Sequence, residues 1–367
     1  MLAALIFSVD LFSILGICKA HFKTQFGDKE YLCLIAAYSV WISRFLVFSV
    51  FLLIPGIGNA IRPISFIILL IPHMIAFRFV KKTYMLTLKN LKLTRVVALT
   101  VVISILSQLG ENTWDGSAYH LPIEMLAATS KSLFGWPDFI YAQWQQSSFE
   151  LAGSFYDILF KSYFAGSLIS LGSFIFLALI FSSYSGLKLR SSLIILLSVP
   201  SIFQQIGTRY IDLSLAVTTF AFYILMSEYQ TSNFKVSNFL QKKRILLAGI
   251  FVTTGMMFGA KSSSFLPAVL IFIVFFSLHV KSQQKLDSFN IRQHLSLMFT
   301  MFFGLTFGML PVAVRNIIEF SNPLYPYKIP GFSNGLFGFS KVSNYLSRFY
   351  SDQIGMSGHG GQNLYRI

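Results

Sequence analysis

The chain has 367 residues, of which 54% are hydrophobic and 12% are charged, and its mean hydropathy is +0.65. This composition excludes a soluble globular protein, because too little polar surface remains to face water, and it predicts a polytopic membrane protein. The formal net charge of +15 would indicate a nucleic-acid partner in a soluble protein, but here the basic residues gather in short loops between apolar runs, so we expect no nucleic-acid binding.

Apolar runs of roughly 15 to 24 residues recur along the chain, and each is close to the ~20 residues with which an α-helix crosses ~30 Å of hydrocarbon. We therefore predict an all-α fold with about ten transmembrane helices. The predicted spans cover residues 2–18, 31–54, 63–80, 96–110, 163–183, 191–204, 213–227, 245–259, 265–280 and 295–314.

Charged loops set the orientation of these spans. The loop at 81–95 has five Lys and Arg residues and no acid, so we place it in the cytoplasm, and the other loops follow by alternation. The segment Glu111–Lys161 then lies outside the cytoplasm, and it holds six of the 14 acidic residues. We expect this external loop to contain juxtamembrane helices that lie on the surface, with Trp136, Tyr141 and Trp144 at the level of the lipid headgroups.

The chain divides into three predicted regions. Residues 1–95 hold three spans and the basic loop, residues 96–314 form a module of seven spans, and residues 315–367 begin a further external loop. Asp10 and Arg44 lie within the first two spans, where we expect them to pair inside the bundle. Because the chain stops in a Gly-rich segment without a closing helix, we expect further spans to follow.

Asp115 is the first candidate functional residue, since it follows a predicted span by only a few residues. A carboxylate at the membrane interface can act as a general base or ligate a metal; alternatively, it caps the helix that follows. His120 lies at a predicted helix start, where a structural hydrogen bond is the alternative to a catalytic role. We expect Glu150 and Asp157 to be solvated or helix-end charges.

Three cations, Arg209, Lys261 and Arg315, lie at the external ends of predicted spans. They suit the phosphate of a membrane-anchored substrate, because Arg forms bidentate contacts and Lys supplies a point charge. Simpler explanations are also open. Arg209 can form a local ion pair with Asp212, three residues later, and Lys261 can extend from its span to the interface.

Four segments carry a resemblance to a known family. They are WDGSAYHLP after the fourth span, RYIDLSLA at the seventh, GAKSSS after the eighth and RNIIEFSNPLYP after the tenth. In this order, and on one side of the membrane, they resemble the GT-C superfamily of integral-membrane glycosyltransferases, and its GT-C_A class in particular, over residues 96–330. The chain departs from the family pattern in three ways: three spans precede the module, no DxD-type acidic pair follows the sixth span, and SNP replaces the usual GNP.

The resemblance implies that spans four to ten form a GT-C module with a large first external loop. It further implies transfer of a sugar from a polyprenyl-phosphate-linked donor to an acceptor hydroxyl on the extracytoplasmic face, with inversion and with Asp115 as the base. The other catalytic candidates are Tyr119, His120 and Asp212. The candidates for binding the substrate and its phosphate are Arg209, Lys261, Arg315, Asn316 and Tyr325.

The same resemblance implies the partners and the location. The donor is a polyprenyl-phosphate sugar, the acceptor is a lipid, a glycan or a protein, and membrane lipids surround the chain in the cytoplasmic (inner or plasma) membrane of a bacterium. Since such a donor already carries an activated phosphate, no cofactor is required and a divalent metal is chemically optional.

Two other functions fit a chain with many spans. A transporter or flippase of a lipid-linked or anionic substrate is one, although such proteins show inverted repeats and broken helices near the middle of the membrane, and no repeat is visible here. A polysaccharide polymerase or ligase is the other; its main site is a late external loop rich in Arg and His, in place of an acidic first loop.

Overall fold

The computed structural model describes residues 2–74, 120–136, 147–163, 165–231, 239–260, 273, 277, 291–323 and 325, and all regular secondary structure in these ranges is helical. The prediction of an all-α chain is confirmed for this part. By its internal contacts the chain forms two compact units, Met1–Pro311 and Val312–Ile367, and each is described by itself.

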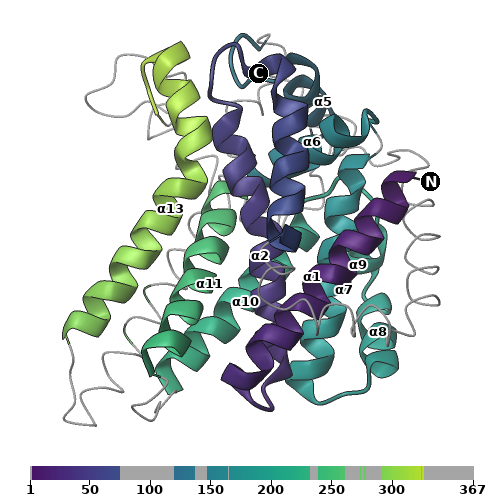
Figure 1. The fold of residues 1–367 in the computed structure, drawn as a ribbon, viewed down its shortest axis with the longest axis vertical. Helices are drawn as coiled ribbons and strands as arrows, with labels where there is room; N and C mark the ends of the chain where they lie inside the picture. Colours follow the sequence, from purple (N-terminus) through teal and green to yellow (C-terminus); the bar gives the residue numbers. More distant parts are fainter. Residues whose placement is uncertain are drawn as a thin grey trace, which may run out of the picture. The chain divides into compact units, whose positions relative to one another are not determined.

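Figure 1 shows the described helices, coloured in chain order from purple to yellow. In the first half of the chain they are α1 (Leu2–Phe26), α2 (Glu30–Phe51), the 3-10 helix η1 (Ile57–Asn59), a helix over Ile61–Met74, α5 (Leu121–Ser130) and α6 (Ser148–Phe160). In the second half they are the 3-10 helix η4 (Ala165–Ser167), α7 (Leu168–Ser185), α8 (Leu189–Leu197), α9 (Pro200–Gln205), α10 (Asp212–Thr231), α11 (Phe239–Ala260) and α13 (Ile291–Phe320).

Within the described residues, four helical segments are long and apolar enough to cross a membrane. They are Glu30–Phe51, Ala165–Ser185, Lys242–Ala260 and Leu295–Phe320, and they match the second, fifth, eighth and tenth predicted spans. The part of the chain that the structure describes is thus all-helical, with four helices that could span a membrane. The predicted spans over 96–110 and 265–280 fall outside the described residues, apart from residues 273 and 277.

The sixth predicted span, residues 191–204, is not one helix. Helix α8 ends at Leu197 and α9 begins at Pro200, and Val199 between them is extended, with φ −86° and ψ 109°. Proline has no N–H to donate and disfavours helical geometry in the residue before it, which accounts for the break. The nine residues of α8 rise only about 14 Å, so α8 alone is too short to cross the hydrocarbon. The prediction of one continuous helix here was wrong.

The tenth predicted span is longer than expected. Helix α13 continues to Phe320 rather than ending at residue 314, with Pro311 inside it. Arg315 and Asn316 therefore lie on the helix and not in a loop after it, as the sequence had indicated.

Helix α2 is the centre of the first unit, since it packs against α1, α6, α7 and α11 (Figure 1). Its fully buried Trp41 donates a hydrogen bond from Nε1 to the Tyr156 hydroxyl of α6, at 3.2 Å. The Phe45 ring packs edge-on against the rings of both Trp41 and Tyr156. Aromatic residues thus fix α6, a helix of the predicted external loop, against the apolar bundle.

A buried ion pair joins the first two helices, as the sequence predicted. Both guanidinium Nη atoms of Arg44 lie 2.8 Å from the carboxylate oxygens of Asp10. His73, on the helix over Ile61–Met74, extends this contact, with Nε2 at 2.7 Å from Asp10 Oδ1. Asp10 and Arg44 are 3% and 4% exposed, so these charges are held by one another and not by water.

Helices α11 and α13 approach so closely that glycine is required where they meet. A Cβ atom on Gly255 would lie 2.9 Å from the carbonyl oxygen of Gly304, and one on Gly304 would lie 2.5 Å from the carbonyl oxygen of Phe251. A Cβ atom on Gly308 would collide with the Gly255 carbonyl. Small residues at such a contact let two membrane helices pack backbone to backbone.

Candidate functional site

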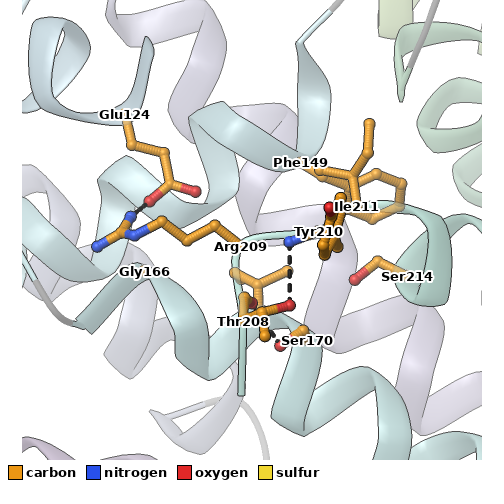
Figure 2. Close-up of a pocket in the computed structure, with 10 residues that line it drawn as sticks. Glu124, Phe149, Gly166, Ser170, Thr208, Arg209, Tyr210, Ile211 and Ser214 are labelled. Atoms are coloured by element: carbon orange, nitrogen blue, oxygen red, sulfur yellow. Dashed lines mark hydrogen bonds and ion pairs between the residues drawn. The ribbon is translucent and has the colours of Figure 1, made fainter. Parts of the chain in front are cut away.

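The candidate site of the first unit lies where α5, α6 and the loop at 206–211 meet. The loop is held by Ser170 of α7, whose hydroxyl accepts from the Gly207 N–H at 3.1 Å and donates to the Thr208 carbonyl at 2.7 Å. The Thr208 hydroxyl in turn accepts from the Tyr210 N–H at 3.3 Å, as Figure 2 shows. These bonds present the side chains of Arg209 and Tyr210 toward α5 and α6.

Arg209 is buried between two carboxylates. Its Nη1 forms an ion pair with Glu124 of α5, and it lies 3.5 Å from Asp157 Oδ2 of α6. Figure 2 shows the Glu124 carboxylate facing the guanidinium. Glu124, Arg209 and Asp157 are only 2%, 5% and 3% exposed. The external loop and the loop before α10 are therefore tied together by a buried, charge-assisted contact.

Two glycines make room for this contact. A Cβ atom on Gly166 would lie 2.5 Å from Arg209 Nη1 and would also collide with the Glu124 carboxylate. A Cβ atom on Gly153 of α6 would collide with the same carboxylate. The ion pair thus requires glycine on both sides.

Asp157 is held by a backbone N–H group as well as by Arg209. Its Oδ1 accepts a hydrogen bond from the Gly166 N–H at 2.8 Å. Burial raises the pKa of Asp157 to about 8, and the N–H groups of Gly166 and Ala165 only partly offset that rise.

A second buried pair lies beside this cluster. His120 Nδ1 is 2.9 Å from Glu150 Oε1, and the two residues are 1% and 3% exposed. The His120 ring lies 6.1 Å from the ring of Tyr210, measured between centroids, in an edge-on arrangement. His120 directly precedes α5, and Glu150 is in the first turn of α6.

A small pocket opens beside Arg209. Glu124, Phe149, Ser170, Thr208, Arg209 and Tyr210 are among the residues that line it, and its volume is about 10 Å³. A cavity of about that size holds at most about one water molecule. The pocket therefore has no room for a sugar in this conformation.

Sequence reasoning missed the burial of the acids of this site. Glu150 and Asp157 were expected to be solvated or helix-end charges. Glu150 does lie in the first turn of α6, but neither acid is solvated, because every residue of α6 from Ser148 to Leu159 is buried. Trp136 is likewise only 8% exposed within the protein. Its expected position at the level of the lipid headgroups stays a prediction. The missed signal is the composition of SFELAGSFYDILF, in which two acids stand in a helix that is apolar or small on every face.

The predicted site residues have different outcomes. Asp115, Tyr119 and Lys261 lie outside the described residues. Asp212 is exposed and is the first residue of α10. The sequence named Asp212 as the local partner of Arg209, whereas the structure pairs Arg209 with two acids that are distant in the sequence.

No protein-family model, curated protein or solved structure matches this chain. Its function is therefore argued from its own residues. Among the residues that the structure describes, no group of three or more His, Cys, Asp or Glu side chains is arranged to hold a metal ion.

The second unit contains the remaining predicted binding residues. Arg315 is 2% exposed, and its guanidinium donates to Asn316 Oδ1 from Nε at 3.2 Å and from Nη2 at 2.9 Å. The Asn316 amide donates to the Tyr325 carbonyl at 3.2 Å. The Tyr325 ring stacks on Phe320 with centroids 4.1 Å apart. The segment RNIIEFSNPLY thus folds back on the end of α13, which brings three predicted binding residues into one local cluster.

Proposed function

We propose that the chain is a membrane glycosyltransferase of the GT-C type, which transfers a sugar from a polyprenyl-phosphate-linked donor to an acceptor hydroxyl, with inversion, on the extracytoplasmic face of a bacterial cytoplasmic membrane. The observation that carries the proposal is the contact between His120 of WDGSAYHLP and Tyr210 of RYIDLSLA, whose rings are 6.1 Å apart. Two of the segments that resemble the family, 90 residues apart in the sequence, meet in one buried site.

In the proposed reaction Asp115 deprotonates or orients the acceptor hydroxyl, which attacks the anomeric carbon while the lipid phosphate leaves. The leaving phosphate needs cationic stabilisation, which we assign to Lys261 and Arg315, with Asn316 and Tyr325 beside Arg315. Since Glu124 balances the charge of Arg209, Arg209 in this scheme ties the external loop to the loop at 206–211. The donor supplies its own activated leaving group, so the scheme needs no cofactor, and a divalent metal is optional.

The first experiment replaces the proposed base. Purified protein in lipid nanodiscs is incubated with a panel of polyprenyl-phosphate sugars, and release of polyprenyl phosphate is measured. Because a general base contributes about 10²–10⁴-fold to a rate, we expect Asp115→Asn and Asp115→Ala to lower release by at least about 100-fold. Asp28→Asn, in the exposed turn between α1 and α2, is the matched control and should retain the wild-type rate.

Near-wild-type release by either folded, membrane-inserted Asp115 variant would show that Asp115 is not the base. If the wild-type protein cleaves none of the donors while remaining folded, the proposed reaction itself is wrong.

One structural feature favours a second candidate, a transporter or flippase of lipid-linked substrates. The break between α8 and α9 resembles the interrupted helices that line transporter sites. Reconstituted vesicles distinguish the two: a flippase moves a labelled polyprenyl-phosphate sugar between leaflets and leaves it intact, whereas a glycosyltransferase cleaves it.

A further inference from the structure

We propose that α8 binds an anionic glycerophospholipid, whose phosphate lies against Lys188 and Arg190 and whose acyl chains lie along Ile194, Ile195 and Leu197. The site is at the end of α8 that the loop charges place at the cytoplasm. It lies outside the proposed sugar-transfer reaction and does not depend on it. The inference gives a role to a helix that is too short to cross the membrane by itself.

The two cations at the start of α8 have no acidic partner in the protein. Lys188 and Arg190 are exposed, and neither side chain forms a hydrogen bond or an ion pair among the residues that the structure describes. The first turn of α8 has no acidic residue, and the sequence has no Asp or Glu between Asp157 and Asp212. Two positive charges are therefore left for an anionic partner.

Two other lysines that the alternation of loops places toward the same end differ in this respect. Lys19 Nζ lies 2.5 Å from Oε1 of Glu30, and Lys29 Nζ lies 2.6 Å from Oε2 of Glu228. Both lysines are exposed, as the cations of α8 are. What distinguishes the cations of α8 is therefore the lack of an acidic partner, and not their exposure.

Apolar side chains continue from these cations along the outer side of α8. The two buried residues of α8 are Ser192 and Leu196, and the helix packs against α7 (Figure 1). Ile194, Ile195 and Leu197 are 62%, 44% and 41% exposed. They begin about 6 Å along the helix from the second cation. A cationic end with an apolar flank next to it matches a phospholipid, in which the phosphate is joined to the acyl chains.

An aromatic residue beside this end supports its position at the headgroups. Tyr184 lies in the last turn of α7 and is 42% exposed. Its ring packs edge-on against the ring of Tyr31 of α2, with centroids 5.3 Å apart. Tyrosine is enriched where headgroups meet hydrocarbon, because its ring is apolar and its hydroxyl is polar. Lys188 follows Tyr184 by one short turn, so we place it at the same level.

Photocrosslinking of a lipid to α8 tests the site. The protein is placed in phosphatidylcholine nanodiscs with a small fraction of phosphatidylglycerol that carries a photoreactive group in an acyl chain, and mass spectrometry locates the adducts. We expect adducts on residues 189–197. Phosphatidylcholine with the same photoreactive chain should give at least about tenfold fewer, because it has no net charge to pair with two cations. Equal labelling by the two lipids would overturn the proposal.

Charge variants test the two cations. In Lys188→Gln/Arg190→Gln, labelling of residues 189–197 by phosphatidylglycerol should fall about tenfold or more, and by about fivefold in each single variant. The matched control, Lys19→Gln/Lys29→Gln, removes two exposed cations that already have acidic partners, and it should keep the wild-type labelling. So should the charge-preserving Lys188→Arg/Arg190→Lys. Wild-type labelling in the folded single variants, or an equal loss in the matched control, would overturn the role given to these cations.

Competition identifies the source of the phosphate. Unlabelled phosphatidylglycerol should displace the probe, whereas inorganic phosphate should not, because it has no chain to contact the apolar flank of α8. Displacement by polyprenyl phosphate at lower concentrations than by phosphatidylglycerol would assign the surface to a different lipid and overturn the proposal. Labelling does not depend on catalysis, so a protein that transfers no sugar would refute the proposed function and leave this inference standing.

Discussion

Asp157 shows how burial at one residue couples the fold to pH. Its pKa in the folded protein is about 8, against an ordinary value of 3.8, because burial disfavours the charged carboxylate. As the pH rises from about 4 to about 8, the unfolded chain loses this proton before the folded chain does. The free energy of unfolding should therefore fall over this range, by about 1.4 kcal/mol for each unit of difference in pKa.

The Asp157→Asn variant tests this dependence. Asparagine keeps an oxygen that can accept from the Gly166 N–H, and it has no proton to lose. The thermal midpoint of the variant relative to wild type should therefore increase from pH 4 to pH 8, in parallel scans of both proteins. Asp28→Asn, at an exposed position, should show a constant difference. A constant difference for Asp157→Asn would refute the raised pKa.

At the residue scale the sequence predicted contacts within one helical turn or between charges of neighbouring spans. The Asp10–Arg44 pair was predictable because two opposite charges in adjacent apolar spans have few alternatives to pairing. The partners of Arg209 were not, because Glu124 lies 85 residues earlier and reaches it only through the packing of α5. Space for the Arg209 guanidinium also depends on Gly166, because a Cβ atom there would lie 2.5 Å from Arg209 Nη1. Only the folded structure shows this contact.

At the scale of elements, hydropathy located helices well and helix ends poorly. The seventh predicted span, 213–227, corresponds to α10 over Asp212–Thr231, because a long apolar run is a local property of the sequence. The end of α13 was missed for a different reason. Arg315 marked the predicted end of a span, but its bonds to Asn316 let the helix continue with the cation buried.

The glycine contact between α11 and α13 yields a prediction at the same scale. Gly308→Leu places a side chain where the Gly255 carbonyl lies, so the helices have to separate. We expect a loss of about 1–3 kcal/mol, seen as a lower thermal midpoint in detergent, in line with overpacking elsewhere. Thr306→Leu, two residues earlier on an exposed position of α13, is the control and should change the midpoint little. Equal midpoints for the two variants would show that the close approach is unimportant.

For the whole molecule, two contacts agree with the predicted alternation of loops. Lys29 and Glu228, both assigned to cytoplasmic loops, form an ion pair at 2.6 Å. The Leu133 N–H donates to the Leu52 carbonyl at 3.1 Å. Leu133 belongs to the predicted external loop, and Leu52 lies near the external end of the second predicted span. Each contact therefore joins residues that the alternation places at the same end of the bundle. The membrane face of each end was assigned from the charge of the loops alone.

Labelling of single cysteines tests that sidedness. Cys18 and Cys33 are buried and are first replaced by alanine, after which Asn59→Cys and Lys188→Cys are introduced separately at exposed positions. In intact cells, a maleimide that cannot cross membranes should label the cysteine at position 59 and leave the one at position 188 unlabelled until the cells are opened. The reverse pattern would place the proposed site in the cytoplasm and exclude the proposed reaction on the outer face.

The Asp10–Arg44 pair also bears on how the chain enters the membrane. Helix α1 has 25 residues, yet it is not among the four segments apolar enough to span by composition. A lone Asp or Arg at the centre of an inserting helix costs about 2.5–3.5 kcal/mol. If α1 spans the membrane as predicted, that cost falls when the two charges meet during insertion, and the turn at Gly27–Lys29 is short enough to allow this. In that case we expect the pair to favour insertion of α1 and α2 together, as one hairpin.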